Sequence, residues 1–327
     1  MKIKRALDRI PGGMMVVPLL LAALINTFAP HLLRIGNFTQ SLFVDGSSTL
    51  IALFLVCAGA QINVRNVGVS LGKGITLLGV KWLVAGIVGC IAYVFAGTNG
   101  LFLGLAPIAI IAAMSNSNGG MYMALVGQYG KSDDKAAYSI LALNDGPFLT
   151  MVALSIFGAI GFVNGLFSAQ AFISVLLPVV VGMVLGNLDH DMRDFLAKGS
   201  DMLIPFFAFA LGMSIDFKTI VTGGLAGILL GVMTVFITGT TGYFVFKLFG
   251  WNPIVGASEG STAGNAVATP AVIASANAAF LPLAKIATVQ VAASTVTTAV
   301  LLPFFVAFLV KRLERKGKLA QYMTTKN

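Results

Sequence analysis

The sequence predicts an all-α integral membrane protein with ten transmembrane helices in two inverted five-helix repeats. Of the 327 residues, 57% are hydrophobic and only 10% are charged, too few charges to coat the surface of a soluble protein. Apolar runs of membrane length recur along the chain, and one run in each half is interrupted by a polar, glycine-rich stretch. A β-barrel is excluded because runs such as 14–28 and 75–95 are apolar on every face and do not alternate.

Ten apolar stretches are long enough to cross the hydrocarbon core of a bilayer. They cover residues 12–31, 46–62, 74–97, 100–128, 136–160, 168–187, 202–215, 221–247, 252–278 and 286–310. The basic N-terminus followed by the first run imitates a signal peptide. We expect this run to be retained, because it is long enough to span and has a counterpart in the second half.

The net charge of +9 sets the topology and does not indicate a nucleic-acid partner. Placing the N-terminus inside leaves only Arg34, Lys218 and Lys285 outside and Lys81 within a span, with every other lysine and arginine on the cytoplasmic side. This asymmetry predicts that both termini are cytoplasmic. The hydrophilic stretch 187–201 is expected to be a solvated cytoplasmic linker, although its His190 and acidic residues leave a metal site open.

A weak internal repeat divides the chain into halves at 1–165 and 166–327. The segment 57–65 (CAGAQINVR) aligns with 210–218 (ALGMSIDFK), keeping a glycine, an isoleucine, a short polar residue and a base in register. Five spans per half is an odd number, so the second copy must run through the membrane in the opposite direction. The repeat pairs span four with span nine, which are the two interrupted spans.

The interruptions at 115–120 and 258–265 predict broken helices and a binding site between them. Unwound backbone is tolerated at membrane depth only where protein or a water-filled cavity satisfies it. Each half-helix that follows a break begins with free amide groups and a positive dipole end, which suit an anion. The candidate substrate-binding residues at the breaks are Asn116, Ser117, Asn118, Gly119, Ser261, Thr262 and Asn265.

Two acidic residues fall inside predicted spans, where a carboxylate costs about 2.5–3.5 kcal/mol at the helix centre. Glu259 lies within the second break and is the first candidate for ion coupling, either carrying a proton or ligating sodium with neighbouring oxygens. A purely structural carboxyl that caps the next half-helix is the alternative. Asp145 follows Asn144 in span five and is a candidate for substrate binding and ion coupling, with a helix kink as the alternative.

Lys81 is the one cation expected well inside a span. Its ammonium group either reaches toward the membrane surface or balances a buried acid or a substrate carboxylate. Cys57 and Cys90 fall in spans and are expected to be packing residues without a disulfide. No cofactor is expected.

Four long segments closely resemble the bacterial 2-keto-3-deoxygluconate permeases. They are MKIKRALDRIPGGM at 1–14, AMSNSNGGMY at 113–122, LNDGPF at 143–148 and ASEGSTAGNAVATP at 257–270. The resemblance covers essentially the whole chain and implies uptake of 2-keto-3-deoxygluconate with H+ across the inner membrane of a Gram-negative bacterium.

More distantly, the sequence looks like the sodium-coupled bile acid transporters. That resemblance implies ten spans in a panel and a core, with spans four and nine broken and crossing. It also implies a sodium site of polar residues and a glutamate. Glu259 occupies the comparable place, and a sodium site there would include Ser258 and Asn116. The coupling ion, H+ or Na+, stays open at this point, and a sodium-coupled symporter of a small organic anion is the alternative function.

Other classes of protein have no support in the sequence. A channel would need repeated polar rings along a pore, and a membrane enzyme would need a nucleophile, metal or cofactor motif. We therefore expect a transporter embedded in the lipid bilayer, not an enzyme, with no obligate protein partner.

Overall fold

The computed structural model describes residues 2–8, 13–61, 71–97, 99–131, 134, 137–141, 147–159, 169–214, 217–319 and 322. Within these residues the chain is helical, and the only β-type pairing is an isolated bridge between Phe102 and Leu105. The expected all-α fold is therefore confirmed for the described part of the chain.

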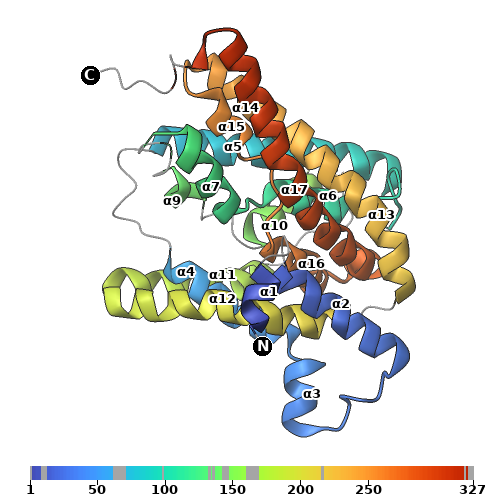
Figure 1. Ribbon diagram of the computed structural model, residues 1–327. Helices are drawn as coiled ribbons and strands as arrows, with labels where there is room; N and C mark the ends of the chain where they lie inside the picture. Colours follow the sequence, from blue (N-terminus) through green and yellow to red (C-terminus); the bar gives the residue numbers. More distant parts are fainter. Residues whose placement is uncertain are drawn as a thin grey trace.

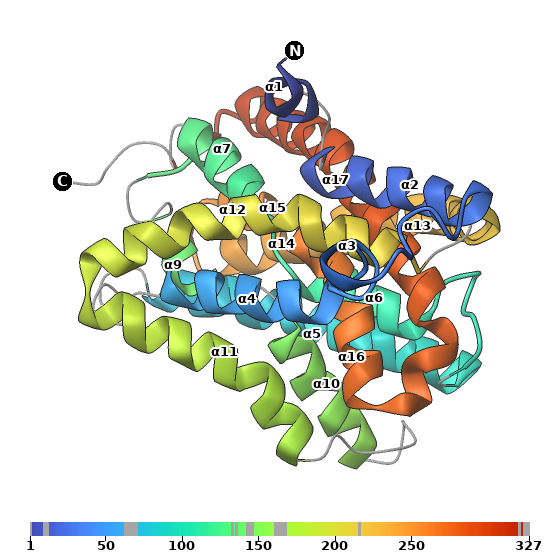
Figure 2. The same cartoon turned by 90° about the horizontal axis from the view of Figure 1, so that it is seen from below.

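Four helices form one layer of the molecule. They are α2 (Gly13–Phe28), α4 (Ser47–Ala60), α11 (Ala169–Leu188) and α12 (His190–Gly212). Helix α12 contacts both α2 and α4, and α11 packs along α4. Figure 2 shows α4, α11 and α12 side by side, so this layer joins helices from both halves of the sequence.

The second layer is built around long helices. They are α5 (Leu71–Ala96), α13 (Phe217–Met233), which continues through a π-helical turn (Thr234–Thr238) into α14 (Gly239–Leu248), and α17 (Leu281–Arg315). Helix α13 packs along α17, and α14 contacts α5. In Figure 1 this layer lies above α4, α11 and α12.

Shorter helices fill the second layer and the connections. Those in or beside the second layer are α6 (Pro107–Ser115), α7 (Gly119–Tyr129), α9 (Tyr138–Leu141), α10 (Phe148–Ala159), α15 (Pro253–Ala257) and α16 (Thr269–Ala276), with 3-10 turns at Asn265–Ala268 and Ala278–Phe280. Helices α1 (Ile3–Asp8) and α3 (Asn37–Phe43) adjoin the first layer.

Glycines allow the closest helix contacts in both layers. A Cβ built on Gly182 would lie 2.0 Å from the carbonyl oxygen of Val56, so α11 and α4 meet backbone to backbone. In the second layer, a Cβ on Gly227 would lie 2.5 Å from the carbonyl oxygen of Gln290. Lipid supplies no hydrophobic driving force for helix association, so membrane helices depend on close packing. Small residues at such positions allow it.

The outer face of the second layer is apolar. Phe304 and Phe308 of α17 are 70% and 61% exposed, and Leu83 and Ile87 of α5 also project outward. A soluble protein would leave such a surface open to aggregation, whereas the hydrocarbon of a bilayer covers it.

Four uninterrupted helices among the described residues are long and apolar enough to cross a membrane. They are Gly72–Ala96, His190–Gly212, Val221–Leu248 and Ala278–Arg315, and the bent pair α3–α4, which meets at 62°, gives a fifth if it counts as one span. The remaining predicted spans correspond to shorter or broken helices. The structure thus fits a multi-pass membrane protein, while the count of ten spans and the inverted repeat stay predictions.

The predicted loop at 187–201 is wrong. Helix α11 continues to Leu188, and α12 begins at His190 after the single residue Asp189, whose carboxylate accepts a hydrogen bond from the Asp191 amide. This N-cap starts a helix whose first turns carry charged residues on exposed positions. The charged residues therefore lie at the exposed end of a long helix. The helix that contains predicted span seven begins 12 residues before the expected position 202.

We predict that Gly227→Ala destabilises the protein by about 1–3 kcal/mol, because the new methyl group overlaps backbone atoms of Gln290 on α17. Gly224→Ala on the same helix is the matched control, since open space surrounds its Cβ position. Thermal unfolding of the two purified variants measures the difference. Equal melting temperatures would contradict the close α13–α17 contact.

Candidate functional site

The first predicted break lies between α6 and α7. Helix α6 ends at Ser115, and Asn116 and Asn118 have extended backbone conformations before α7 begins at Gly119. The side-chain oxygen of Asn118 accepts a hydrogen bond from the Met121 amide at 3.0 Å and so caps α7. Asparagine is among the best N-cap residues, which explains why a new helix starts here.

The second predicted break separates α15 from the 3-10 turn at Asn265. Helix α15 starts at Pro253 behind the N-cap Asn252, ends at Ala257, and leaves residues 258–264 outside any helix. Asn252 also donates a hydrogen bond to the carbonyl of Tyr129, which joins the end of α7 to the start of α15. Both breaks therefore fall where the sequence predicts them.

Helix α17 provides hydrogen-bond partners for Thr262 and Ala263 of the second break. The Thr298 hydroxyl accepts a hydrogen bond from the Thr262 amide at 3.1 Å, and Thr295 donates to the carbonyl of Ala263. The hydroxyls of Thr262 and Ser294 lie 2.8 Å apart. Peptide groups without hydrogen-bond partners are costly in an apolar interior. The hydroxyls on this face of α17 therefore stabilise the unwound segment.

The two breaks touch each other. The backbone amide of Asn118 donates a hydrogen bond to the side-chain oxygen of Ser261 at 3.1 Å, across 143 residues of sequence. The expected meeting of the two interrupted segments is thus present, and their unwound backbones form one polar centre inside the second layer.

Lys81 of α5 lies at this centre and balances the acid there. Its ammonium group donates hydrogen bonds to the carbonyl oxygens of Glu259 and Ser261 and lies 3.7 Å from the Glu259 carboxylate. Lys81 is 1% exposed and Glu259 is 3% exposed. Of the two roles left open for Lys81, the structure supports the counter-ion and excludes one at the membrane surface.

The Glu259 carboxylate has spare bonding capacity. Neither of its oxygens accepts a hydrogen bond of good geometry from a described residue, although the Ser117 hydroxyl lies close to it. A buried carboxylate with unused acceptor positions can take up a proton or a small cation. No cluster of three metal-binding side chains of the His, Cys, Asp and Glu types occurs in the described ranges.

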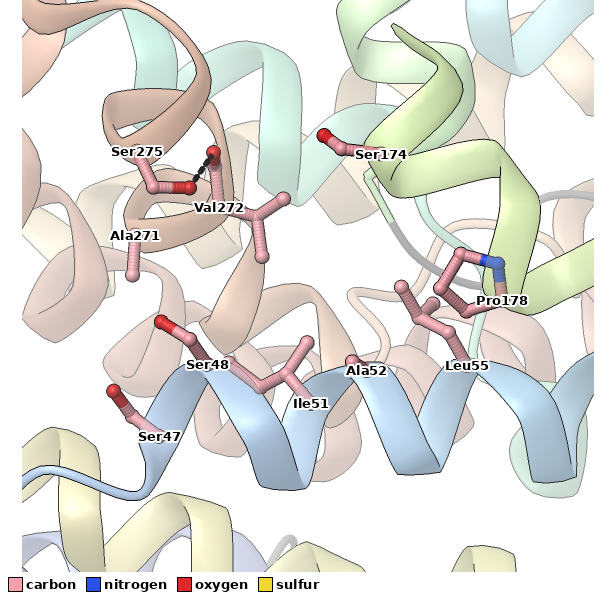
Figure 3. Close-up of a pocket in the computed structure, with 10 residues that line it drawn as sticks. All are labelled: Ser47, Ser48, Ile51, Ala52, Leu55, Ser174, Pro178, Ala271, Val272 and Ser275. Atoms are coloured by element: carbon pink, nitrogen blue, oxygen red, sulfur yellow. Dashed lines mark hydrogen bonds between the residues drawn. The ribbon is translucent and has the colours of Figure 1, made fainter. Parts of the chain in front are cut away.

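A small cavity lies between the two layers. Its volume is about 130 Å³, and Figure 3 shows α4 on one side with α11 and α16 on the other. Four serines line it together with aliphatic side chains: Ser47, Ser48, Ser174 and Ser275. The Ser275 hydroxyl donates to the carbonyl of Val272 at 2.7 Å. Hydroxyls beside aliphatic groups suit a small, hydroxylated molecule.

Comparison with known proteins gives a match over almost the whole chain. Residues 4–315 match the family described as KdgT, 2-keto-3-deoxygluconate permease. The chain belongs to this permease family. Permeases carry solutes across membranes, so the family indicates a transporter and not an enzyme, in agreement with the apolar outer surface.

Individual relatives agree with the family assignment. 2-Keto-3-deoxygluconate permease 1 of Salmonella typhimurium (strain LT2) is 51% identical, with 98% of this chain and 99% of that protein covered. The permease of Enterobacter sp. (strain 638) is 42% identical over 95% of this chain and 94% of its own length. The permease of Bacillus subtilis (strain 168) is 38% identical, with coverage of 97% and 96%.

The permease brings most of its predicted site residues together at the two breaks. Several of these side chains have structural partners: Asn116 donates to the carbonyl of Ala112, Asn118 caps α7, and Thr262 contacts Ser294. The side-chain oxygen of Asn265 is buried without a hydrogen-bond partner among the described residues. Asn144 and Asp145 lie outside the described residues.

Gln290 of α17 is a polar residue beside the site that no sequence motif indicates. Its amide donates to the carbonyl of Gly104 and accepts from the amide of Ala106, which fixes the start of α6 against α17. Thr150 of α10 likewise pairs with Ser115 at the end of α6, with the two hydroxyls 3.0 Å apart. A polar residue inside an apolar span was the available signal, since such residues seek protein partners.

We predict that Lys81→Met costs about 3–5 kcal/mol of stability, because it leaves the buried Glu259 carboxylate without its counter-ion. The double variant Lys81→Met with Glu259→Gln should lose less than the sum of the two single changes. Denaturant or thermal unfolding of the three purified variants gives the coupling between the residues. Strictly additive losses would show that the two side chains do not interact.

Proposed function

We propose that this permease is a secondary active transporter that carries 2-keto-3-deoxygluconate into the cytoplasm together with a proton. The observation that carries the proposal is the buried Glu259 carboxylate at the contact of two broken helices, held beside Lys81. A carboxyl group in such a place binds and releases a proton as its surroundings change between states.

The substrate follows from the family and from the chemistry of the breaks. The relatives described above are named for 2-keto-3-deoxygluconate, an anion with a ketone and several hydroxyls. The N-terminus of α7 supplies a positive dipole end for a carboxylate. The proposed substrate-binding residues are Asn116, Ser117, Asn118, Gly119, Asn144, Asp145, Ser261, Thr262 and Asn265.

The serine-lined cavity is a second place for the hydroxyl end of this substrate. Helix α16, which follows the second break, contributes Ser275 to it, and α4 contributes Ser47 and Ser48. The same helix segment thus runs from the polar centre to the cavity. A sugar acid has both an anionic end and a hydroxylated end, and these two polar regions suit one end each.

The division at 1–165 and 166–327 into inverted repeats is part of the proposal. Each layer takes matching members of both halves: α2 and α4 join α11 and α12, whereas α5 and α6 join α13 to α17. Two halves related by a pseudo-twofold axis in the membrane plane would produce this distribution. The location proposed is the inner membrane with both termini cytoplasmic, as the charge asymmetry indicates.

Sodium coupling is the alternative, because oxygen atoms at the breaks could also hold Na+. Uptake of labelled 2-keto-3-deoxygluconate into proteoliposomes, with proton and sodium gradients imposed separately, distinguishes the two. We expect accumulation with an inward proton gradient in sodium-free buffer. Accumulation that requires a sodium gradient would refute proton coupling.

We predict that Glu259→Gln abolishes uphill accumulation but leaves exchange of substrate across the membrane, because the amide cannot carry a proton. Counterflow and gradient-driven uptake in the same proteoliposomes measure the two activities. Normal accumulation by this variant would move the coupling role to another acid, with Asp145 next.

We predict that Asn118→Asp weakens binding of 2-keto-3-deoxygluconate more than Asn118→Ala does. Aspartate is as good an N-cap as asparagine and keeps α7 in place, but it sets an anion beside an anion. Alanine instead removes the cap at a cost of about 1 kcal/mol of stability. Calorimetric titration at a pH where the aspartate is ionised gives both affinities, and equal losses would mean that Asn118 does not face the carboxylate.

A further inference from the structure

We propose that the ammonium group of Lys81 occupies the cation position at the contact of the two breaks, so that the chain carries its own cation where a sodium ion would otherwise bind. The inference deepens the transport function proposed above, because it concerns which ion the site accepts. It makes Lys81 a residue that determines ion specificity.

The atoms around the ammonium group are a typical sodium donor set. Lys81 donates hydrogen bonds to two backbone carbonyl oxygens, of Glu259 at 2.9 Å and of Ser261, and faces one carboxylate oxygen at 3.7 Å. In transporters with broken helices, unwound carbonyls and nearby oxygens coordinate the coupling Na+. An ammonium group with three N–H donors fills the same space and the same charge requirement.

Burial makes a second cation unfavourable at this place. Lys81 is 1% exposed and Glu259 is 3% exposed, so water does not screen charges here. A sodium ion next to a charged Lys81 would place two positive charges against one carboxylate, and repulsion between close charges is strong where the dielectric constant is low. The lysine therefore excludes sodium by its charge.

The fold holds Lys81 in this position. It lies in the middle of α5 and reaches the segment 258–264, whose own shape is fixed by hydrogen bonds to α17. Lys73, two turns earlier on the same helix, pairs instead with Asp134 at 2.6 Å and is partly exposed. Lys73 thus offers a matched control: a lysine of α5 in an ion pair away from the breaks.

The test measures sodium binding without transport. The melting temperature of the purified protein is compared in sodium chloride and choline chloride at equal ionic strength. We expect no sodium-specific shift for the wild type or for Lys73→Met. Lys81→Ala opens the site beside the carboxylate and should gain a sodium-specific rise of roughly 2–4 °C. The double variant Lys81→Ala with Glu259→Gln should lose that gain.

Two results would overturn the proposal. One is a sodium-specific rise, or saturable binding of radioactive sodium, in the wild type. The other is a folded Lys81→Ala variant whose melting temperature does not respond to sodium. Lys81→Ser is prepared in parallel in case the alanine variant does not fold, and the wild-type measurement decides independently of both. Because no substrate is present, failure of 2-keto-3-deoxygluconate transport would leave this result unchanged.

Discussion

The structure depends on one constraint: peptide groups that leave a helix inside an apolar layer must find partners within the protein. At the contact of the two breaks they do so in pairs. The Asn118 amide bonds to the Ser261 hydroxyl, and the Thr262 amide bonds to the Thr298 hydroxyl. The Lys81 ammonium group donates hydrogen bonds to two carbonyl oxygens of the second break. Without these partners, the unwound segments would cost several kcal/mol for each exposed group.

This constraint explains the composition of the helices around the breaks. Gln290, Ser294 and Thr298 are four residues apart and so share one face of α17, the face that contacts α6 and the second break. Further along the same helix, Phe304 and Phe308 are exposed. A long helix with one polar stripe is therefore a structural requirement of the broken helices, and glycines such as Gly227 let α13 close on its other flank.

Local sequence predicted the breaks well because their cause is local. Glycine, asparagine and serine favour caps and turns over helix interiors, so 115–120 and 258–265 could be recognised directly. The partner of Lys81 could not be recognised from the local sequence, because it is 178 residues away. The predicted start of α12 is wrong because a run of charged residues favours a loop. The Asp189 cap instead decides where the helix begins. Asp145 lies outside the described residues, so its role stays a prediction.

One short segment connects Glu259 to the contact between the two layers. The break that holds its carboxylate continues through the turn at Asn265 into α16, and α16 contributes Ser275 to the cavity against α4 and α11. The other side of the same break is anchored on α17 and Lys81. In the transport mechanism proposed above, a change of charge at Glu259 acts on Lys81 and the backbone of the break, and through them on α16, the helix that faces the other layer. Under that proposal, coupling between ion and solute needs only this contiguous segment.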